Sequence, residues 1–409
     1  MNTVHIQLDS TGGATVAVLV VDNPPVNAMS MAVRRELRAA VLAATVDPRV
    51  QAIVLIGAND RFIPGADIRE FGKPMSGPSG RDVIAALEAC TEVAKPIVAA
   101  LAGNALGGGL EIALGCHFRI ATPDCRLGLP EVNIGLLPGA GGTQRLPRLV
   151  GAARAVEMIT SGKPVDGRAA LACGLVDELA EDGLRAAALA FARHAVTAEL
   201  PLRRVRDRSD RLADVDLAVF ADIRAKNAKK WRGQIAPQRI VQCVEAACSR
   251  PFEEAYALEL DAFDECKASP QRAALIHLFQ AEREVARIPG LPDGLVPQPV
   301  RSAAVIGAGT MGGGIAMCFA NAGIPVWLLD ATPEGLARGR ALIEKNYATS
   351  VARGSLSREA MERALSLITG TLEFAAIHDC DIVVEAAFED MAVKQQVRSE
   401  EHTSELQSP

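Results

Sequence analysis

Aromatic side chains are scarce in this chain, at 4% of its 409 residues. Hydrophobic residues still make up 49%, so a globular core has to be built mainly from Ala, Val, Leu and Ile. The sequence also lacks a basic excess. Its formal net charge is −6, which argues against nucleic acid as a partner because no positively charged face dominates.

Cysteine pairs and targeting signals are lacking as well. The nine cysteines include no C-x-x-C pair, and their odd number is typical of a reducing compartment. The six histidines do not cluster with them, so we expect no metal site. Residues 1–9 have no basic or apolar segment, and we expect no signal peptide. Residues 97–115 are hydrophobic, but Asn104, Glu111 and several glycines favour a buried loop and helix over a membrane span.

Local patterns predict alternating strands and helices in the N-terminal half. Apolar runs bounded by breaker residues predict buried strands over 52–57 and 97–102. Apolar residues at helical spacing predict helices over 34–44 and 152–161. This alternation is typical of an α/β fold.

The chain is expected to divide into several parts. Residues 1–195 carry the alternating pattern, and residues 196–288 are helical with few strand signals. Residues 289–300 are rich in proline and glycine, which predicts a linker. A new unit of strand, turn, helix and strand follows over 301–397.

Two glutamates stand behind segments rich in small residues. Glu111 ends the sequence GGGLE, and Glu131 ends GLPE. Small residues leave backbone N–H groups open. Two carboxylates beside such groups suit the addition of water to an activated double bond, because one takes a proton from water and the other gives a proton to carbon. The amides hold the negative charge that develops on a carbonyl oxygen.

Each acidic residue also has a structural interpretation. Glu111 alone could be a carboxylate favoured near the N–H groups of a helix start, and Glu131 alone could be a surface acid after a proline. The occurrence of both, each with its own open amides, favours catalysis. Glu36, Glu70 and Glu88 have no such surroundings and are interpreted as solvated helix faces.

A second motif begins at residue 303. The apolar run 303–306 is followed by GAGTMG at 307–312, a G-x-G-x-x-G sequence, and by a helix and a strand over 326–329. The glycines permit a tight turn and bring a pyrophosphate close to a helix N-terminus. An acid at the end of the second strand can bind an adenosine ribose and would repel the 2′-phosphate of NADP. The predicted NAD contacts are Gly307, Gly309, Met311, Gly312 and Asp330.

Together these motifs resemble the multifunctional enzymes of fatty-acid β-oxidation. Residues 1–290 are similar to their enoyl-CoA hydratase (crotonase) part with its linker helices, and residues 301–397 to the opening of their 3-hydroxyacyl-CoA dehydrogenase part. The segments that carry the resemblance are NPPVNA at 23–28, IPGADI at 63–68, GGGLE at 107–111, LPE at 129–131 and LPGAGGTQR at 137–145. The fold it implies is α/β: a crotonase-type ββα spiral, a helical linker and a partial Rossmann NAD-binding domain.

The resemblance also implies roles for individual residues. The N–H groups of Ala66 and Gly108 would bind the oxygen of a coenzyme A thioester. Glu111 would activate water, Glu131 would protonate C2, and the N–H of Gly139 would help hold the water. A trans-2-enoyl-CoA would thus become a 3-hydroxyacyl-CoA. Three alternatives stay open: additional Δ3-to-Δ2 isomerisation through Glu131, isomerisation alone, and a catalytically silent module that binds acyl-CoA or NAD.

Expectations for the C-terminal part follow from the same resemblance. It implies that Glu389 and Lys394 lie near the NAD, and that the catalytic histidine of the dehydrogenase lies beyond this chain, so we expect no oxidation of 3-hydroxyacyl-CoA. Residues 398–409 resemble translated sequencing-adapter DNA, and we expect a non-native tail there. Oligomeric state stays open. The composition favours the cytoplasm of a bacterium, with the peroxisome as the location in a eukaryote.

Overall fold

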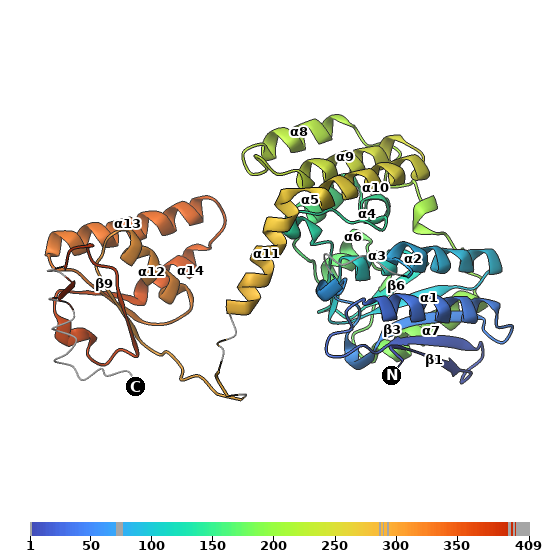
Figure 1. The fold of residues 1–409 in the computed structure, drawn as a ribbon, viewed down its shortest axis with the longest axis horizontal. Coiled ribbons are helices and arrows are strands. Elements are labelled where there is room, and N and C mark those ends of the chain that lie inside the picture. The colour runs from blue at the N-terminus through green and yellow to red at the C-terminus, as the bar shows by residue number, and fades with distance from the viewer. Residues whose placement is uncertain are drawn as a thin grey trace. The chain divides into compact units, whose positions relative to one another are not determined.

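The chain forms two compact units, Met1–Ile288 and Pro289–Pro409 (Figure 1). The computed structural model describes residues 2–70, 77–285, 288, 290–292, 294–391, 394, 395 and 397. The expected non-native tail at 398–409 lies outside these residues, and the domain boundaries drawn from the sequence stay predictions.

The first unit is built on a six-stranded sheet. Its strands, in order across the sheet, are β1 (Val4–Asp9), β2 (Val16–Val21), β3 (Ala52–Gly57), β4 (Ile97–Leu101), β6 (Phe118–Ala121) and β8 (Glu178–Leu179). The pair β1 and β2 is antiparallel, and the others run parallel. Because β3 and β4 are buried along their whole length, their sequences are continuous apolar runs rather than alternating ones.

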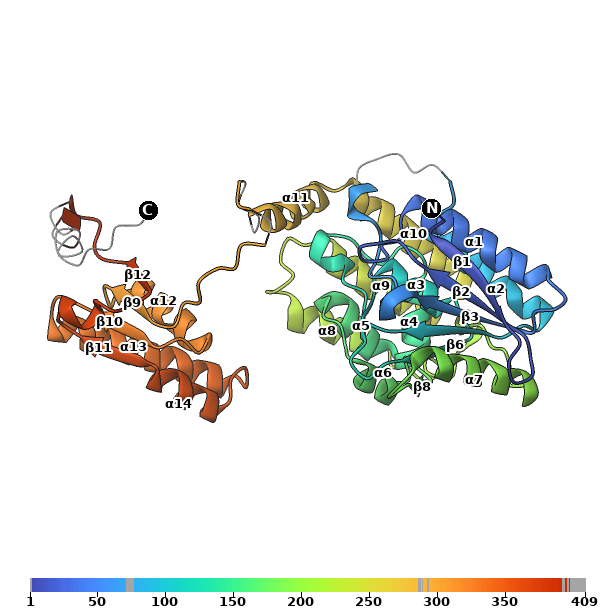
Figure 2. The same cartoon turned by 90° about the horizontal axis from the view of Figure 1, so that it is seen from below.

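Helices cover both faces of this sheet (Figure 2). Leu19 and Leu55 point to the face packed by α1 (Met31–Val46) and α2 (Gly80–Ala89). Their neighbours Val18 and Val54 point to the other face and pack with α7 (Leu184–Thr197). Successive side chains of a strand alternate between faces, so each strand contributes to two hydrophobic clusters.

A second, two-stranded sheet positions the candidate site. Its strands β5 (Asn104–Leu106) and β7 (Arg126–Gly128) are parallel, with Leu106 opposite Gly128. The short helix α3 (Gly108–Leu114) follows β5, and the 3-10 helix η4 (Glu131–Ile134) follows β7. Both segments therefore leave the same end of the small sheet. Along the chain, β4, β5 and α3 form one ββα unit of the expected spiral.

The remaining helices of the first unit complete its core. They are α4 (Gly142–Val150), α5 (Ala152–Ser161), α6 (Gly167–Cys173), α8 (Ala218–Asn227), α9 (Ala236–Ser249), α10 (Phe252–Ala268) and α11 (Pro270–Val285). Short 3-10 helices lie at η1 (Ala58–Asp60), η2 (Ile68–Glu70), η3 (Cys90–Val93) and η5 (Val205–Asp207). The expected linker helices α9 and α10 contribute Val244 and Cys266 to the main hydrophobic cluster, so they are packed into the first unit.

The second unit has a four-stranded parallel sheet. The order is β11 (Ile368–Thr371), β10 (Val326–Leu329), β9 (Ala303–Ile306) and β12 (Ile382–Glu385). Helices α12 (Thr310–Asn321), α13 (Pro333–Ala352) and α14 (Arg358–Ser366) and the 3-10 helix η6 (Phe374–Ile377) connect the strands. The order third, second, first, fourth is that of a Rossmann fold, as the sequence predicts.

The hydrophobic segment 97–115 forms β4, β5 and α3. Within the described part of the chain, no helix has the length and hydrophobicity needed to cross a membrane.

Candidate active site

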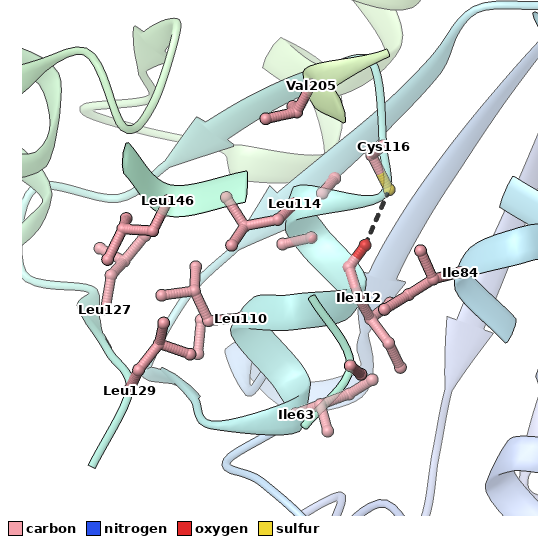
Figure 3. Packing of buried hydrophobic residues seen from close by; sticks show 14 of the residues in the cluster. Ile63, Ile84, Leu110, Ile112, Leu114, Cys116, Leu127, Leu129, Leu146 and Val205 are labelled. Carbon is pink, nitrogen blue, oxygen red and sulfur yellow. Dashed lines mark hydrogen bonds between the residues drawn. The ribbon is translucent and has the colours of Figure 1, made fainter. Parts of the chain in front are cut away.

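Glu111 lies in the first turn of α3 and is 4% exposed. The helix is held by its apolar side chains: Leu110 packs near Leu127 and Leu129, and Ile112 near Ile84 (Figure 3). This packing on several sides fixes the direction in which the glutamate projects.

Two backbone amides of the glycine-rich segment 137–145 bind this carboxylate. The N–H groups of Ala140 and Gly142 donate to Oε1 of Glu111 over 2.7 and 2.9 Å. A Cβ at residue 142 would lie 2.9 Å from the same oxygen, so glycine is needed there for the approach. The second oxygen, Oε2, has no hydrogen-bond partner among the described residues.

Glu131 comes to the start of α3 from the other strand of the small sheet. Its Oε1 would lie 3.0 Å from a Cβ at Gly107, the residue that precedes α3 with φ +52°. Glu131 as a residue is partly exposed, but its Oε2 is buried without a hydrogen-bond partner among the described residues. The two carboxylates predicted from the sequence are thus brought together.

Burial and mutual repulsion act differently on the pKa values of the two acids. Burial and the charge of Glu111 raise the pKa of Glu131 well above its usual value. Burial also raises the pKa of Glu111, but the N–H groups of Ala140 and Gly142 oppose this change. Two carboxylates in one enclosed site do not both ionise readily. We therefore assign the proton to Glu131 and the negative charge to Glu111.

The two predicted oxyanion amides are open. Ala66 forms an isolated parallel bridge with Met29, in which Met29 N–H donates to Gly65 and Asp67 N–H donates to Met29. This pattern leaves the N–H of Ala66 outside the pairing. Neither it nor the N–H of Gly108 donates to an acceptor in the described part of the chain. The side chain of Met29 also covers Gly108, where its Cε would lie 2.6 Å from a Cβ.

Gly139 lies directly before the amides that hold Glu111. Its carbonyl oxygen accepts a hydrogen bond from Nε of Arg81 over 2.7 Å. The ring of Phe263 would lie 2.6 Å from a Cβ at this position, which excludes larger residues. Its N–H has no acceptor among the residues that the structure describes.

A third buried carboxylate, which the sequence interpretation missed, lies beside this pair. Glu259 on α10 is 0% exposed and accepts hydrogen bonds from the N–H groups of Gly141 and Thr143 over 2.7 and 3.0 Å. Burial and the charge of Glu111 raise its pKa to about 8. The sequence signal that could have revealed Glu259 is its position on the apolar face of a helix, one helical turn after Ala255.

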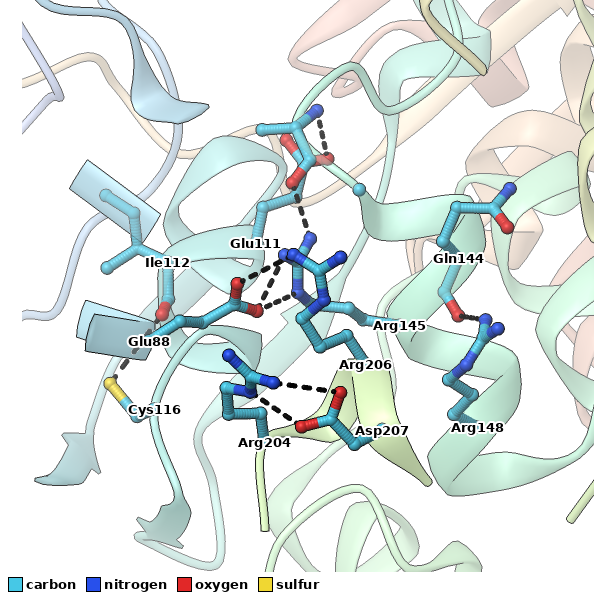
Figure 4. A network of polar contacts seen from close by, with 12 residues as sticks. Glu88, Glu111, Ile112, Cys116, Gln144, Arg145, Arg148, Arg204, Arg206 and Asp207 are labelled. Carbon is cyan, nitrogen blue, oxygen red and sulfur yellow. Dashed lines mark hydrogen bonds and ion pairs between the residues drawn. The ribbon is translucent and has the colours of Figure 1, made fainter. Parts of the chain in front are cut away.

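Glu88 corrects another expectation. It was interpreted as part of a solvated helix face, but it is 6% exposed because Arg145 binds it through Nε and Nη2 over 3.0 and 2.7 Å. Arg206 also reaches Glu88, at 3.5 Å (Figure 4). Through Nη1, Arg145 donates to the carbonyl oxygen of Ala140, so this ion pair supports the loop that holds Glu111.

The predicted NAD contacts lie at the carboxyl ends of β9 and β10. Gly307 has φ +103°, a conformation that favours glycine. A Cβ at Gly312 would lie 1.7 Å from the carbonyl oxygen of Gly307. Glycine at residue 312 therefore lets the start of α12 pack against the backbone of the loop. Nothing lies within 4 Å of a Cβ built at Gly309, which leaves open space at the start of α12. Met311 in the first turn is 71% exposed.

Acidic and basic side chains border the same loop. Asp330 follows β10, and its Oδ2 accepts a hydrogen bond from the N–H of Ala308 over 2.9 Å. Beyond β12, Nζ of Lys394 pairs with Glu389 at 2.8 Å and with Glu385 at 3.8 Å. The two expected contacts Glu389 and Lys394 thus bind each other, and Glu389 has a largely exposed side chain.

All nine cysteines lie in described positions and are free thiols. Where the chain is described, no group of His, Cys, Asp and Glu side chains is arranged to hold a metal ion.

Comparison with known proteins gives the class. Residues 11–235 match the enoyl-CoA hydratase/isomerase family, and residues 302–404 match the NAD binding domain of 3-hydroxyacyl-CoA dehydrogenase. The chain belongs to the enoyl-CoA hydratase/isomerase family. The second match reaches into the segment from residue 398 that was set apart as foreign, and that expectation stays untested.

Two relatives show both segments in one protein. A peroxisomal bifunctional enzyme of Danio rerio is 41% identical over 94% of this chain and 53% of its own length. A peroxisomal fatty acid beta-oxidation multifunctional protein of Oryza sativa is 37% identical over 95% of this chain and 55% of its own length. The chain spans about half the length of these relatives. The expected relationship to multifunctional β-oxidation enzymes is confirmed.

A solved structure supports the fold of the first unit. The enoyl-CoA hydratase/isomerase of Pseudoalteromonas atlantica is 24% identical, covers 71% of this chain and 100% of its own, and has a TM-score of 0.50. At this identity the likeness concerns the fold alone, and the expected crotonase-type fold is confirmed.

Proposed function

We propose that the first unit hydrates trans-2-enoyl-CoA to 3-hydroxyacyl-CoA in fatty-acid β-oxidation. The observation that carries the proposal is the convergence of Glu111 and Glu131 at the start of α3, where Glu131 keeps a buried oxygen without a partner among the described residues. Membership of the enoyl-CoA hydratase/isomerase family supports the substrate class.

The proposed reaction uses the two carboxylates in opposite protonation states. Glu111, held through Oε1 by two amides, keeps Oε2 for a water molecule and takes a proton from it as the oxygen attacks C3. Glu131, whose pKa is raised by burial and by Glu111, gives its proton to C2. General acid and base groups of this kind typically contribute about 100- to 10,000-fold each.

The open amides supply the third element of the proposed mechanism. As water attacks C3, negative charge develops on the thioester oxygen. The N–H groups of Ala66 and Gly108 have no competing acceptor in the described part of the chain and are available to bind this oxygen, while the N–H of Gly139 helps to hold the water. Loss of one such donor typically costs about 3 kcal/mol of transition-state stabilisation.

A hydration assay with matched variants tests the proposal. Hydration removes the ultraviolet absorbance of the conjugated enoyl thioester, which gives a direct rate. We expect Glu111→Gln and Glu131→Gln to lower kcat by about 100- to 10,000-fold and to bind a saturated acyl-CoA as wild type does. Glu157→Gln on α5, with a side chain that is 66% exposed, is the control. Binding without turnover by wild type would support the silent module instead.

The unpartnered oxygen of Glu131 also favours isomerisation as a second activity. In this reaction a single carboxylate takes a proton from C2 and returns it to C4 without a water molecule, so Glu131 starts in its ionised form, which loss of the charge on Glu111 favours. We therefore expect Glu111→Gln to lose hydration while it retains the conversion of a 3-enoyl-CoA to a 2-enoyl-CoA. Turnover of the 3-enoyl substrate by wild type with no hydration would identify an isomerase alone.

We propose NAD as the ligand of the second unit. The glycine loop with open space at Gly309, and Asp330 at the end of β10, fit a dinucleotide. Gly307, Gly309, Met311 and Gly312 would face the pyrophosphate, with Glu389 and Lys394 further along the cofactor. Bound NAD supplies hydride-accepting chemistry. Calorimetric titration checks binding, and equal affinity for NADP would contradict the role given to Asp330.

The proposed location is a reducing compartment. The names of the relatives from Danio rerio and Oryza sativa give a peroxisomal location for those proteins, which supports the peroxisome over the bacterial cytoplasm for this chain. Recovery of the native protein outside peroxisomes in cell fractionation would contradict this.

A further inference from the structure

Four consecutive backbone amides at the start of α4 are divided between two buried carboxylates. Along residues 140–143, the first and third N–H groups donate to Oε1 of Glu111. The second and fourth donate to the two oxygens of Glu259. Successive amides of this segment therefore donate alternately to Glu111, an acid of the proposed hydration site, and to Glu259, which lies 118 residues away from Gly141 in sequence.

The contact with Glu259 is part of a larger one made by a single face of α10. Tyr256, Glu259 and Phe263 occupy helical positions that share this face. The ring of Phe263 lies against Gly139, and the ring of Tyr256 would lie 3.6 Å from a Cβ at Gly141. The helix thus contacts the glycine-rich loop at Gly139, Gly141 and Thr143, although it lies outside residues 11–235 that match the hydratase family.

The loop has few means of its own to keep this shape. Residues 139, 141 and 142 are glycines, and Gly141 has φ +94°, so no side chain there restrains the backbone. Arg81 and Arg145 bind carbonyl oxygens of this loop, and Glu259 restrains its amides: besides the two N–H groups it accepts a hydrogen bond from the hydroxyl of Thr143. Without it, the buried N–H groups of Gly141 and Thr143 would lack acceptors, which is unfavourable, and the loop would rearrange.

We propose that Glu259 is a positioning residue for hydration, which holds residues 140–143 so that their two remaining amides fix the carboxylate of Glu111. It does not touch substrate in this arrangement. It sets the direction of Oε2 of Glu111 toward the attacking water. This inference rests on the proposed function, since it assigns Glu111 the task of activating water.

The test compares Glu259→Gln with Glu254→Gln in the full chain. The two amides donate to different oxygens of Glu259, so in the glutamine variant one of them would face an NH2 group, which is itself a donor. Glu254 lies on the same helix and is exposed, so it controls for the same change of side chain away from the glycine-rich loop. We expect Glu259→Gln to lower kcat by about ten- to a hundred-fold, as for a small misplacement of a catalytic group, with KM within three-fold of wild type, and Glu254→Gln to match wild type.

Amide hydrogen exchange of the peptide that contains residues 140–143 gives a readout independent of turnover. We expect at least ten-fold faster exchange there in Glu259→Gln, with the strands β3 and β4 as protected as in wild type. Unchanged exchange in Glu259→Gln would overturn the inference, whether or not wild type is active. Inactivity of wild type alone would count only against the proposed function. Unchanged kcat in an active enzyme would overturn it as well.

A milder variant covers the case in which Glu259→Gln does not fold. Thr143→Val removes the hydroxyl donor to Glu259 and keeps the backbone amide and the side-chain shape. We expect a smaller change in the same direction, with kcat lowered about two- to ten-fold at constant KM. A raised KM with unchanged kcat would assign Glu259 to substrate binding and contradict a positioning role.

Discussion

Replacing Glu131 by glutamine should remove hydration and, at the same time, change how stability depends on pH. The carboxyl has a buried oxygen without a partner among the described residues, and burial and Glu111 raise its pKa well above 4.5. At pH values between 4.5 and the raised pKa of Glu131, the folded protein keeps a proton that the unfolded chain releases. The free energy of unfolding of wild type therefore falls as pH rises through this window. Glutamine has a similar shape and does not titrate.

The size of the effect follows from one proton. Each pH unit inside the window changes the stability difference between variant and wild type by up to about 1.4 kcal/mol. As pH rises above 5 within this window, Glu131→Gln should therefore gain stability relative to wild type. The slope is an upper limit, because the charges of Glu111 and Glu259 act on the same carboxyl and these groups take part in its titration.

The measurement is urea unfolding from pH 5 to pH 8 in a Trp327→Phe background. The chain has two tryptophans. Trp327 lies in β10 of the second unit, whereas Trp231 is 3% exposed in the core of the first, so fluorescence then reports the first unit alone. Parallel pH dependences for the two proteins would show that Glu131 is not held protonated, and its assignment as the acid would be wrong.

Three further substitutions probe the supporting contacts. Gly142→Ala would place a Cβ 2.9 Å from Oε1 of Glu111; we expect kcat to fall about ten- to a hundred-fold with little change in KM in the hydration assay. Arg145→Met leaves Glu88 buried with a weaker partner, and urea unfolding should show a loss of about 3 kcal/mol. Gly312→Ala would put a Cβ 1.7 Å from a carbonyl oxygen of the loop, so calorimetry should show NAD binding lost while hydration is retained.

The parts that the sequence predicts best are those in which local signals decide the structure. The strand at 52–57 and the helix at 152–161 have the predicted bounds, and the strand at 97–102 ends one residue earlier. In each case an apolar run or helical spacing is bounded by breaker residues. The strands at 303–306 and 326–329 also agree, because the glycine fingerprint has a fixed place between strand and helix.

The missed parts depend on contacts between distant segments. Glu88 is buried among arginines distant in sequence: Arg145, 57 residues later, forms an ion pair with it, and Arg206 also reaches it. Glu259 meets its amide partners across more than a hundred residues. In sequence both look like ordinary glutamates of amphipathic helices, since helical spacing gives the face of a residue but not the identity of what packs against that face.

The glycines that make the site recognisable in sequence are explained by the carboxylates they accommodate. Gly107 precedes Glu111, yet its missing Cβ makes room for Oε1 of Glu131. Gly142 belongs to a third segment, yet its missing Cβ makes room for Oε1 of Glu111. Each glycine therefore serves an acid that another segment supplies. A substitution at either position would press on a carboxylate that another segment supplies, which explains why three separate short segments together indicate a single chemical site.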